Sequence, residues 1–261
     1  MQPREIGTPS VAKFVVIRHP MVMQAITTKR FGVARVLSKQ GLASRMQAAT
    51  WVLEGHVSVN GHVVRDPEFP VLQDRDIVTV TGLANSSVES IYLLLNKPRG
   101  LITTTSDEKG RDTVYRCFGN TELPWLAPVG RLDRASEGLL LFTNDTAWAA
   151  HITSPESGLD KTYHVQINRL STSQDLQEMQ QGVVIEGELH AMKQVSVLRE
   201  GEKNAWLTIV LDEGKNRQIR KILAALNFDV LRLIRVQIGN LKLGELAKGQ
   251  WRLLDKNEID K

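Results

Sequence analysis

The sequence predicts an α+β protein made of a small N-terminal module, residues 29–81, and a larger domain, residues 91–254. A short polar segment without periodicity, residues 82–90, separates them and is typical of a linker. Strand-like and helix-like segments mix in the larger part, which is long enough for one domain with a sizeable core. The flanking segments, residues 1–28 and 255–261, are expected to be a loose extension and a tail.

The composition excludes several classes of protein. Of the 261 residues, 42% are hydrophobic and 24% are charged, which is ordinary globular usage rather than that of a disordered or fibrous chain. No stretch approaches the ~20 apolar residues of a membrane span. The single cysteine, Cys117, excludes an internal disulfide framework and a zinc site built on several thiolates. We therefore expect a soluble protein in the reducing cytoplasm.

The N-terminal module begins with two predicted helices. The segment RFGVARVLSKQG, residues 30–41, suggests a short helix that Gly41 ends. Ser44 is then expected to cap a second helix, with Gln47 three positions later completing a capping box. The buried side of this second helix is expected to carry Met46, Ala49 and Leu53, with Trp51 and Val52 beside them.

Strands follow these helices in the module. Two alternating apolar segments flank Asn60 and Gly61, and an Asn-Gly pair is the strongest short signal for a β-hairpin, because both turn residues need a positive φ. The segment VLQDRDIVTV, residues 71–80, supplies a further strand.

The positive charge of the chain is concentrated in its N-terminal part. Residues 1–82 hold ten Lys or Arg against six Asp or Glu, whereas the remainder holds 23 of each, so the whole net charge of +4 is N-terminal. The stretch 29–45 has five basic residues and no acidic one: Lys29, Arg30, Arg35, Lys39 and Arg45. Such a patch suits a polyanion such as a phosphate backbone, although a solvated face without a ligand fits the charge alone.

The larger domain is predicted to start with the core strand IYLLLN, which Pro98 interrupts. Further strand-like segments are LLLFT, TYHVQI, AWLTIVL and VLRLIRV. Two helices are predicted between them, QDLQEMQQ and NRQIRKILAALN, and Gly182 ends the first.

One acidic residue in this domain has an unusual setting. Asp133 lies between Arg131 and Arg134, directly before an apolar β segment, and Gly130 and Gly138 let the backbone bend around it. Guanidinium groups nearby hold a carboxylate ionised, and an ionised aspartate in an enclosed site can act as a nucleophile or a base. An ordinary cap or turn role is the more frequent use of such an aspartate.

The helix near residue 220 has one apolar and one basic side. Its apolar stripe consists of Ile219, Ile222, Leu223 and Leu226, and the other side carries Arg217, Arg220 and Lys221. Such a helix can present an arginine to a buried carboxylate while its other cations contact phosphate. A plain amphipathic surface helix has the same spacing.

Other motifs are weak or missing. Tyr163 lies in a predicted strand, where it would stack on a base, handle a proton or, more commonly, fill the core. The histidines show no metal-binding spacing, and the chain has no glycine-rich phosphate loop, dinucleotide fingerprint or G-x-S-x-G elbow. We therefore expect neither a metal nor a cofactor.

Four segments together resemble a known enzyme family. GRLDRASEGLLLFTND resembles the catalytic motif of pseudouridine synthases, in the branch that modifies ribosomal RNA at single sites. LLLNKPRG, KTYHV and EGKNRQIRKI resemble its opening, tyrosine and closing arginine motifs, in the expected order over residues 91–254. VLSKQGLASRMQAATWVLEGHVSVNGHVV resembles the alpha-L RNA-binding domain first described in a small-subunit ribosomal protein. The resemblance implies a mixed, largely antiparallel sheet flanked by helices. Ala135, where many relatives carry a polar or charged residue, departs from the pattern outside the reacting centre.

The resemblance also implies roles for individual residues. Asp133 would be the catalytic aspartate, Arg220 the basic residue that pairs with it, and Tyr163 the tyrosine against the target base. Arg131 would lie beside the flipped nucleotide. The remaining RNA contacts are expected of Lys97, Lys215 and Arg217 and of the basic residues of the N-terminal module, although the opening motif that holds Lys97 looks largely structural.

The function that the resemblance implies is isomerisation of a specific uridine in ribosomal RNA by an enzyme without a cofactor. We expect a slight preference for 23S rRNA and a monomeric protein. Its partner would be ribosomal RNA or a ribosomal assembly intermediate. The alternative is a non-catalytic RNA-binding assembly factor of the same fold. The presence of Asp133, Tyr163 and Arg220 favours the enzyme.

Overall fold

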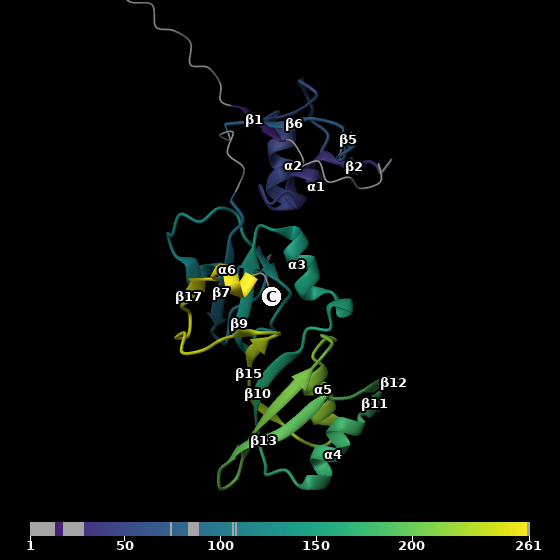
Figure 1. Ribbon diagram of the computed structural model, residues 1–261, viewed down its shortest axis with the longest axis vertical. Coiled ribbons are helices and arrows are strands. Elements are labelled where there is room, and N and C mark those ends of the chain that lie inside the picture. The colour runs from purple at the N-terminus through teal and green to yellow at the C-terminus, as the bar shows by residue number, and fades with distance from the viewer. Residues whose placement is uncertain are drawn as a thin grey trace, which may run out of the picture. The chain divides into compact units, whose positions relative to one another are not determined.

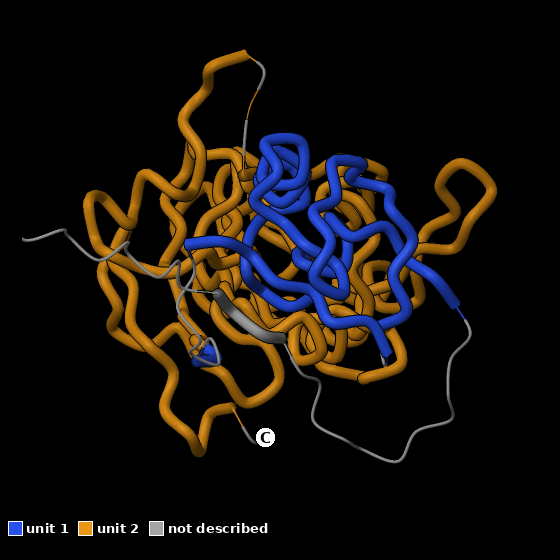
Figure 2. The backbone as a smooth tube through the Cα atoms, turned by 90° about the horizontal axis from the view of Figure 1, so that it is seen from above, with its two compact units in different colours: residues 1–90 blue, residues 91–261 orange. Residues whose placement is uncertain are grey.

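The computed structural model describes two compact units, residues 1–90 and 91–261 (Figures 1 and 2). The described residues are 29–73, 75–82, 89–105, 107 and 109–259, together with the backbone of residues 14–17. Most of the predicted extension, residues 1–28, and most of the predicted linker, residues 82–90, lie outside the described residues.

Unit 1 packs two helices with a small antiparallel sheet. The helices are α1 (Val33–Lys39) and α2 (Arg45–Leu53). The sheet has the order β1 (Phe14–Ile17), β6 (Val78–Thr81), β3 (Val57–Val59) and β4 (His62–Val63), and β2 (Phe31–Gly32) pairs separately with β5 (Pro70–Val71). Strand β1 falls within the predicted loose extension. That expectation is therefore wrong for these four residues, whose backbone pairs with β6.

The local signals of unit 1 give the predicted turns and the predicted N-cap of α2, but the Gln47 side chain does not complete the predicted capping box. Gly41 after α1 has a φ of +71°, and Asn60 and Gly61 of the hairpin have φ values of +50° and +81°. The hydroxyl of Ser44 accepts a hydrogen bond from the backbone N–H of Gln47 at 3.0 Å. These short-range features follow from the residues alone.

The buried side of α2 differs from the prediction. Met46 is 65% exposed and Leu53 is 59% exposed, whereas Ala48 and Val52 are completely buried. Ala48 and Val52 are four residues apart and form the stripe that packs in the unit 1 core, with Ala49 and Trp51 partly buried beside it. The predicted stripe was wrong because contact with α1 and the sheet, rather than total apolarity, sets the rotation of α2.

Unit 2 is built on one long mixed sheet. Its strand order is β13 (Gln194–Glu200), β14 (Ala205–Leu211), β10 (Lys161–Ile167), β15 (Val230–Ile238), β9 (Glu137–Thr143), β7 (Tyr92–Lys97) and β17 (Trp251–Leu253). Strand β8 (Ala127–Val129) also pairs with β9, and β16 (Leu241–Lys242) with β15. Only β9 and β15 run parallel among these pairs of the described chain, so the predicted mixed, largely antiparallel sheet is confirmed.

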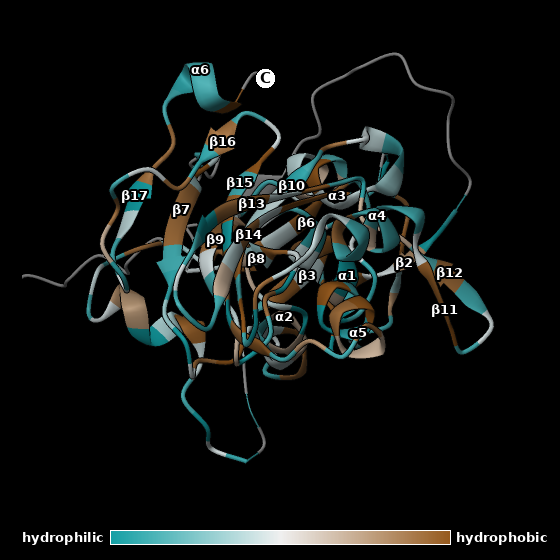
Figure 3. Ribbon diagram, turned by 90° about the horizontal axis from the view of Figure 1, so that it is seen from below, coloured by the Kyte–Doolittle hydropathy of each residue, from teal (hydrophilic) through white to brown (hydrophobic). Residues whose placement is uncertain are grey.

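Helices and a hairpin surround this sheet. They are α3 (Thr146–Thr153), α4 (Ser173–Gln181), α5 (Gln218–Ala225), α6 (Lys256–Ile259), the 3₁₀ turns η1 (Val114–Phe118) and η2 (Pro155–Ser157), and the hairpin of β11 (Val183–Ile185) and β12 (Glu188–His190). Hydrophobic residues are concentrated within β7, β15 and α5, as Figure 3 shows. Helix α5 buries its predicted stripe against β10, β14 and β15.

The sheet of unit 2 has two halves that meet at the parallel pair β9 and β15. One core lies around β10, β14 and α5, and the others lie around β7 and β9. Gly138, the second residue of β9, has a φ of +100°, and a Cβ at this position would overlap the backbone oxygen of Arg235 on β15. Glycine is required here because the two backbones approach so closely. The loop that carries Asp133 ends at this junction.

Two elements at the edges of unit 2 were missing from the prediction. Helix α3 begins after Asp145, whose carboxylate accepts from the N–H groups of Ala147 and Trp148 at 2.9 and 3.0 Å. The predicted tail contains α6, which Glu258 ties to Arg252 through two hydrogen bonds of 2.7 Å. Ile259 packs against the β7–β9 core, so the packed chain continues past residue 254.

Candidate active site

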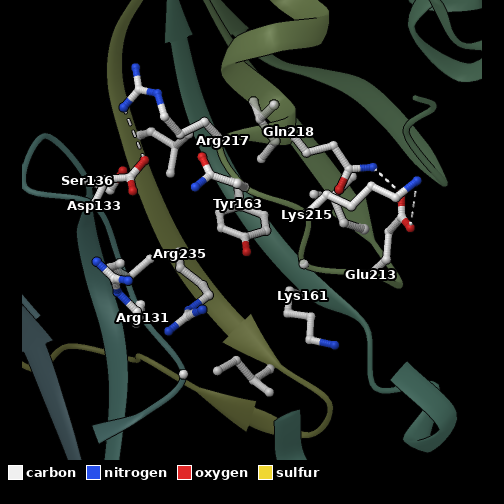
Figure 4. Close-up of a pocket in the computed structure, with 18 of the residues that line it drawn as sticks. Arg131, Asp133, Ser136, Lys161, Tyr163, Glu213, Lys215, Arg217, Gln218 and Arg235 are labelled. Carbon is white, nitrogen blue, oxygen red and sulfur yellow. Dashed lines mark hydrogen bonds and ion pairs between the residues drawn. The ribbon is translucent and has the colours of Figure 1, made fainter. Parts of the chain in front are cut away.

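A pocket of about 450 Å³ opens at the junction of the two sheet halves (Figure 4). Its walls come from the loop before β9, from the face shared by β10 and β15, and from the segment that leads into α5. It brings together six of the residues singled out from the sequence: Arg131, Asp133, Tyr163, Lys215, Arg217 and Arg220. These residues are up to 89 positions apart in the chain, and only the fold gathers them.

Asp133 pairs with Arg217. The Nη1 atom of Arg217 donates to Oδ2 of Asp133 at 3.2 Å, and both side chains are about half exposed. Arg217 has a φ of +52°, a left-handed conformation that is uncommon for a residue with a side chain. Such conformations carry a cost and cluster at functional sites. This one begins α5 and directs the guanidinium toward the Asp133 loop.

The predicted partner of Asp133 was Arg220, and the structure corrects this. Arg220 donates instead to the backbone oxygens of Ala135 at 3.2 Å and Val230 at 3.4 Å. Burial lowers the pKa of Arg220, as does the neighbouring Arg217, while Asp133 acts in the opposite direction. Because α5 turns its apolar stripe into the core, Arg220 lies behind the loop and Arg217, almost one turn earlier, reaches the carboxylate.

Lys97 holds the Asp133 loop from inside. Its side chain is completely buried, and its Nζ donates to the backbone oxygens of Pro98, Asp133 and Ser136 at 3.1, 3.2 and 2.8 Å. Burial lowers the pKa of Lys97 to about 8, although the charges of Cys117, Asp133 and Glu137 act to raise it. The predicted contact of Lys97 with RNA is therefore wrong, because the ammonium group cannot reach a phosphate. The ammonium group instead ties the Asp133 loop to the segment that follows β7.

Further contacts fix the same loop at its other residues. The hydroxyl of Thr103 donates to the backbone oxygen of Leu132 at 2.8 Å, and the N–H of Gly100 donates to that of Arg134 at 2.8 Å. Directly after the loop, buried Glu137 accepts from Nε and Nη2 of Arg232 at 3.0 and 3.1 Å, and Lys248 also pairs with it. The loop is thus preorganised before any substrate enters.

Tyr163 forms part of the pocket wall from β10. It is 9% exposed and lies directly opposite Arg235 of β15 and Ile209 of β14. Lys215 and Gln218 both contact Glu213, at 3.4 and 2.5 Å, on the α5 side of the pocket. Arg131 is exposed at the loop. An aromatic ring, a carboxylate and several cations therefore face one cavity (Figure 4).

The sequence reasoning missed two pocket residues, Lys161 and Arg235. Both are charged residues in core strands: Lys161 is the first residue of β10, and Arg235 lies within the largely apolar segment VLRLIRV of β15. A charge inside a core strand was the available signal, because such a charge is rarely buried without a partner or a role.

Four of the five basic residues singled out in residues 29–45 fall into two groups, and the fifth, Arg30, is exposed. Lys29, Arg35 and Lys39 surround the ring of Phe31, with their charged atoms 5.7, 5.1 and 4.8 Å from its centroid. Arg45 instead forms an ion pair with Glu68 at 2.9 Å. The basic patch predicted for residues 29–45 is therefore centred on Phe31.

Comparison with known proteins decides the family. The sequence model described as RNA pseudouridylate synthase matches residues 91–225, which is more than half of the chain. The chain belongs to this family. The S4 domain model matches residues 32–77 and confirms the RNA-binding module expected there. The predicted enzyme, an RNA pseudouridine synthase, is confirmed as well.

Individual relatives extend over both units. A protein of Aquifex aeolicus named as an uncharacterized RNA pseudouridine synthase is 35% identical, with 87% of this chain and 91% of the relative covered. Ribosomal large subunit pseudouridine synthase B of Bacillus subtilis is 34% identical over 86% and 92%. A crystal structure titled pseudouridylate synthase superposes with a TM-score of 0.61 at 29% identity and covers 88% of this chain and 99% of its own.

Two features of the described residues concern cofactors and membranes. No group of three or more His, Cys, Asp or Glu side chains in this part of the chain is arranged to hold a metal ion. None of its helices has the length and apolarity that crossing a bilayer requires.

Proposed function

We propose that this RNA pseudouridine synthase isomerises one specific uridine in ribosomal RNA of the large subunit. The 34% identity to ribosomal large subunit pseudouridine synthase B of Bacillus subtilis, over most of both chains, supports this substrate class. The cations around Phe31 in unit 1 suit an RNA backbone, which neutralising contacts hold in a salt-dependent way.

The observation that carries the proposal is the carboxylate of Asp133, fixed by Arg217 and by the Lys97-anchored loop, at a cavity that Tyr163 lines. A volume of about 450 Å³ suits a single nucleotide. The target uridine must first leave its stack, at a cost of a few kcal/mol. Tyr163 would then contact the extruded base, and Arg131 on the exposed loop would fill the vacated space.

The reaction exchanges one bond of the nucleoside for another. The bond between uracil N1 and the ribose C1′ breaks and a bond between uracil C5 and C1′ forms, while C5 loses a proton and N1 gains one. Asp133 takes part by one of three routes: as a nucleophile it attacks C1′ or the base, or as a base it takes up a ribose proton. No atom is added or lost, so the isomerisation consumes no second substrate.

Mapping of pseudouridine tests this function. Ribosomal RNA from cells with and without the protein is treated with carbodiimide and read by primer extension, and we expect one stop in large-subunit RNA that requires the protein. Complementation with Asp133→Asn is expected to leave the stop absent, although the variant still binds RNA. Complementation with Arg116→Gln, an exposed position outside the pocket, is the matched control and restores the stop. A protein-dependent stop confined to small-subunit RNA or transfer RNA would contradict the proposed substrate, and turnover by Asp133→Asn would contradict the nucleophile.

A further inference from the structure

The floor of the pocket contains two cations, Lys161 and Arg235, that the steps above do not use. Arg235 on β15 is the direct cross-strand partner of Tyr163 on β10, and Lys161 precedes Tyr163 by two residues on the same strand. Since alternate residues of a strand share a face, the three side chains belong to one face of the sheet. Figure 4 shows all three among the side chains that line the cavity.

Arg235 has an unused donor. Its side chain lies in the interior, with 7% of the residue exposed, and its Nε donates to the backbone oxygen of Leu139 at 2.8 Å. Its Nη2 atom is buried and has no hydrogen-bond partner among the described residues. A buried charged donor without an acceptor is costly, and a native site that keeps one needs a reason, such as a ligand that supplies the acceptor.

No carboxylate contacts the two cations of this floor within the described residues. Neither Lys161 nor Arg235 forms an ion pair within the described part of the chain. The two acids that line the pocket are engaged elsewhere, Asp133 with Arg217 and Glu213 with Lys215.

The behaviour of Lys161 agrees with this arrangement. Burial lowers the pKa of Lys161, and the positive charge of Arg235 lowers it further. The negative charges of Asp160 and Asp212 act in the opposite direction without restoring the ordinary value. Asp160 is itself bound by Lys193 at 2.7 Å, and Lys161 contacts only the backbone oxygen of Asp212, at 3.5 Å. Two like charges side by side in a cavity are stabilised by an anion between them.

We propose that Lys161 and Arg235 form a phosphate-binding site on the pocket floor, which takes the phosphate group of the nucleotide whose base contacts Tyr163. This inference rests on the proposed entry of a uridine nucleotide into the pocket. A phosphate supplies a negative charge and several acceptor oxygens, which suits a guanidinium and an ammonium together. A uracil carbonyl could accept from Nη2 of Arg235, but it would leave both positive charges uncompensated.

The test uses the full chain and small probes. Binding of uridine 5′-monophosphate, uridine 3′-monophosphate, uridine and inorganic phosphate is measured by titration calorimetry or by ligand-observed NMR. We expect at least one monophosphate to bind about tenfold or more tightly than uridine, the effect of one charge-assisted hydrogen bond. Inorganic phosphate is expected to compete with that monophosphate and not with uridine.

Variants assign the preference to the two residues. Lys161→Gln is expected to remove most of the difference between monophosphate and uridine, and Lys161→Arg to keep it. Lys242→Gln, at an exposed position on the neighbouring β16, is the matched control and behaves as wild type. Arg235→Lys retains the charge at the buried position and should keep part of the preference, with circular dichroism confirming the fold.

Several results would overturn the proposal. Equal binding of uridine and both monophosphates, or no binding of any of them at millimolar concentration, means that the floor holds no phosphate. An equal loss of uridine and monophosphate binding in Lys161→Gln indicates a contact to the base or a structural role. Because these probes do not depend on which RNA is modified, a missing stop in large-subunit RNA with an intact phosphate preference contradicts only the proposed substrate.

Discussion

Replacement of Lys97 by Met removes the ammonium group that holds the Asp133 loop while it nearly conserves side-chain volume. The Lys97 ammonium donates to three backbone oxygens, those of Pro98, Asp133 and Ser136, and lies in the interior. Two opposing contributions decide the effect on stability. One is the loss of these hydrogen bonds, and the other is relief of the cost of burying a charge.

The structure sets the size of both contributions. The fall of the Lys97 pKa from its ordinary 10.5 to about 8 corresponds to about 3 kcal/mol, since one pH unit is worth about 1.4 kcal/mol. A neutral amine has two N–H donors, and losing both bonds costs about 3 kcal/mol at about 1.5 kcal/mol each. At pH 7 the two contributions nearly cancel, so wild type and Lys97→Met should differ in free energy of unfolding by less than about 1 kcal/mol.

The pH dependence follows from proton binding. Between about pH 8 and pH 10.5 the unfolded chain binds more protons at this residue than the folded chain, so the contribution of Lys97 to stability grows as the pH rises. The destabilisation caused by Lys97→Met should therefore increase to about 2 kcal/mol near pH 10. Urea unfolding, followed by the fluorescence of the tryptophans, measures this difference from pH 7 to pH 10. Groups common to both proteins cancel in the comparison.

Activity should respond differently from stability. At pH 7, Lys97→Met is expected to lower kcat about 100-fold, because a displacement of about 1 Å at a reacting group has an effect of that size. Lys242→Met, at an exposed position of the same sheet, is the control and should change neither property. A stability difference that does not change with pH, or full activity at pH 7, would refute the assignment of Lys97 as the buried anchor of the loop.

Three further predictions concern other parts of the molecule. Arg217→Gln should lower pseudouridine formation by at least about tenfold in kcat, measured on the mapped substrate, because the ion pair with Asp133 is lost; an effect on KM alone would show that Arg217 only binds RNA. Replacing the three cations around Phe31, Lys29, Arg35 and Lys39, by Ala should weaken RNA binding and flatten its dependence on salt concentration in filter-binding assays. If the slope of affinity against salt concentration does not change, these residues do not contact phosphate. Gly138→Ala should lower the free energy of unfolding by about 2 kcal/mol or more, since the new Cβ would meet the Arg235 backbone at a positive φ; a change within about 0.5 kcal/mol would show that the junction can widen at little cost.

Local patterns predicted much of the fold. The spacing of Ile219, Ile222 and Leu223 placed α5 and its buried side correctly, and Gly182 ended α4 as expected. The same reasoning failed for α2, where Met46 is exposed, because two apolar stripes compete on that helix and only packing selects one. Helix α3 was missed although Asp145 caps it, since its apolar residues lack a clear stripe.

The sequence by itself determined the chemistry that this protein carries: an aspartate between arginines, a strand tyrosine and a basic helix, in an order that matched the pseudouridine synthases. Only the tertiary structure decided which of these residues meet. The rotation of α5 and the left-handed backbone at Arg217 bring that arginine, and not Arg220, to Asp133. Lys97, which was expected to contact RNA, is buried and binds the backbone of the Asp133 loop. The register of β10 and β15 places Arg235 opposite Tyr163. The physical reason is that turns, caps and periodicity act over a few residues, whereas burial and register are set by partners far away in the chain.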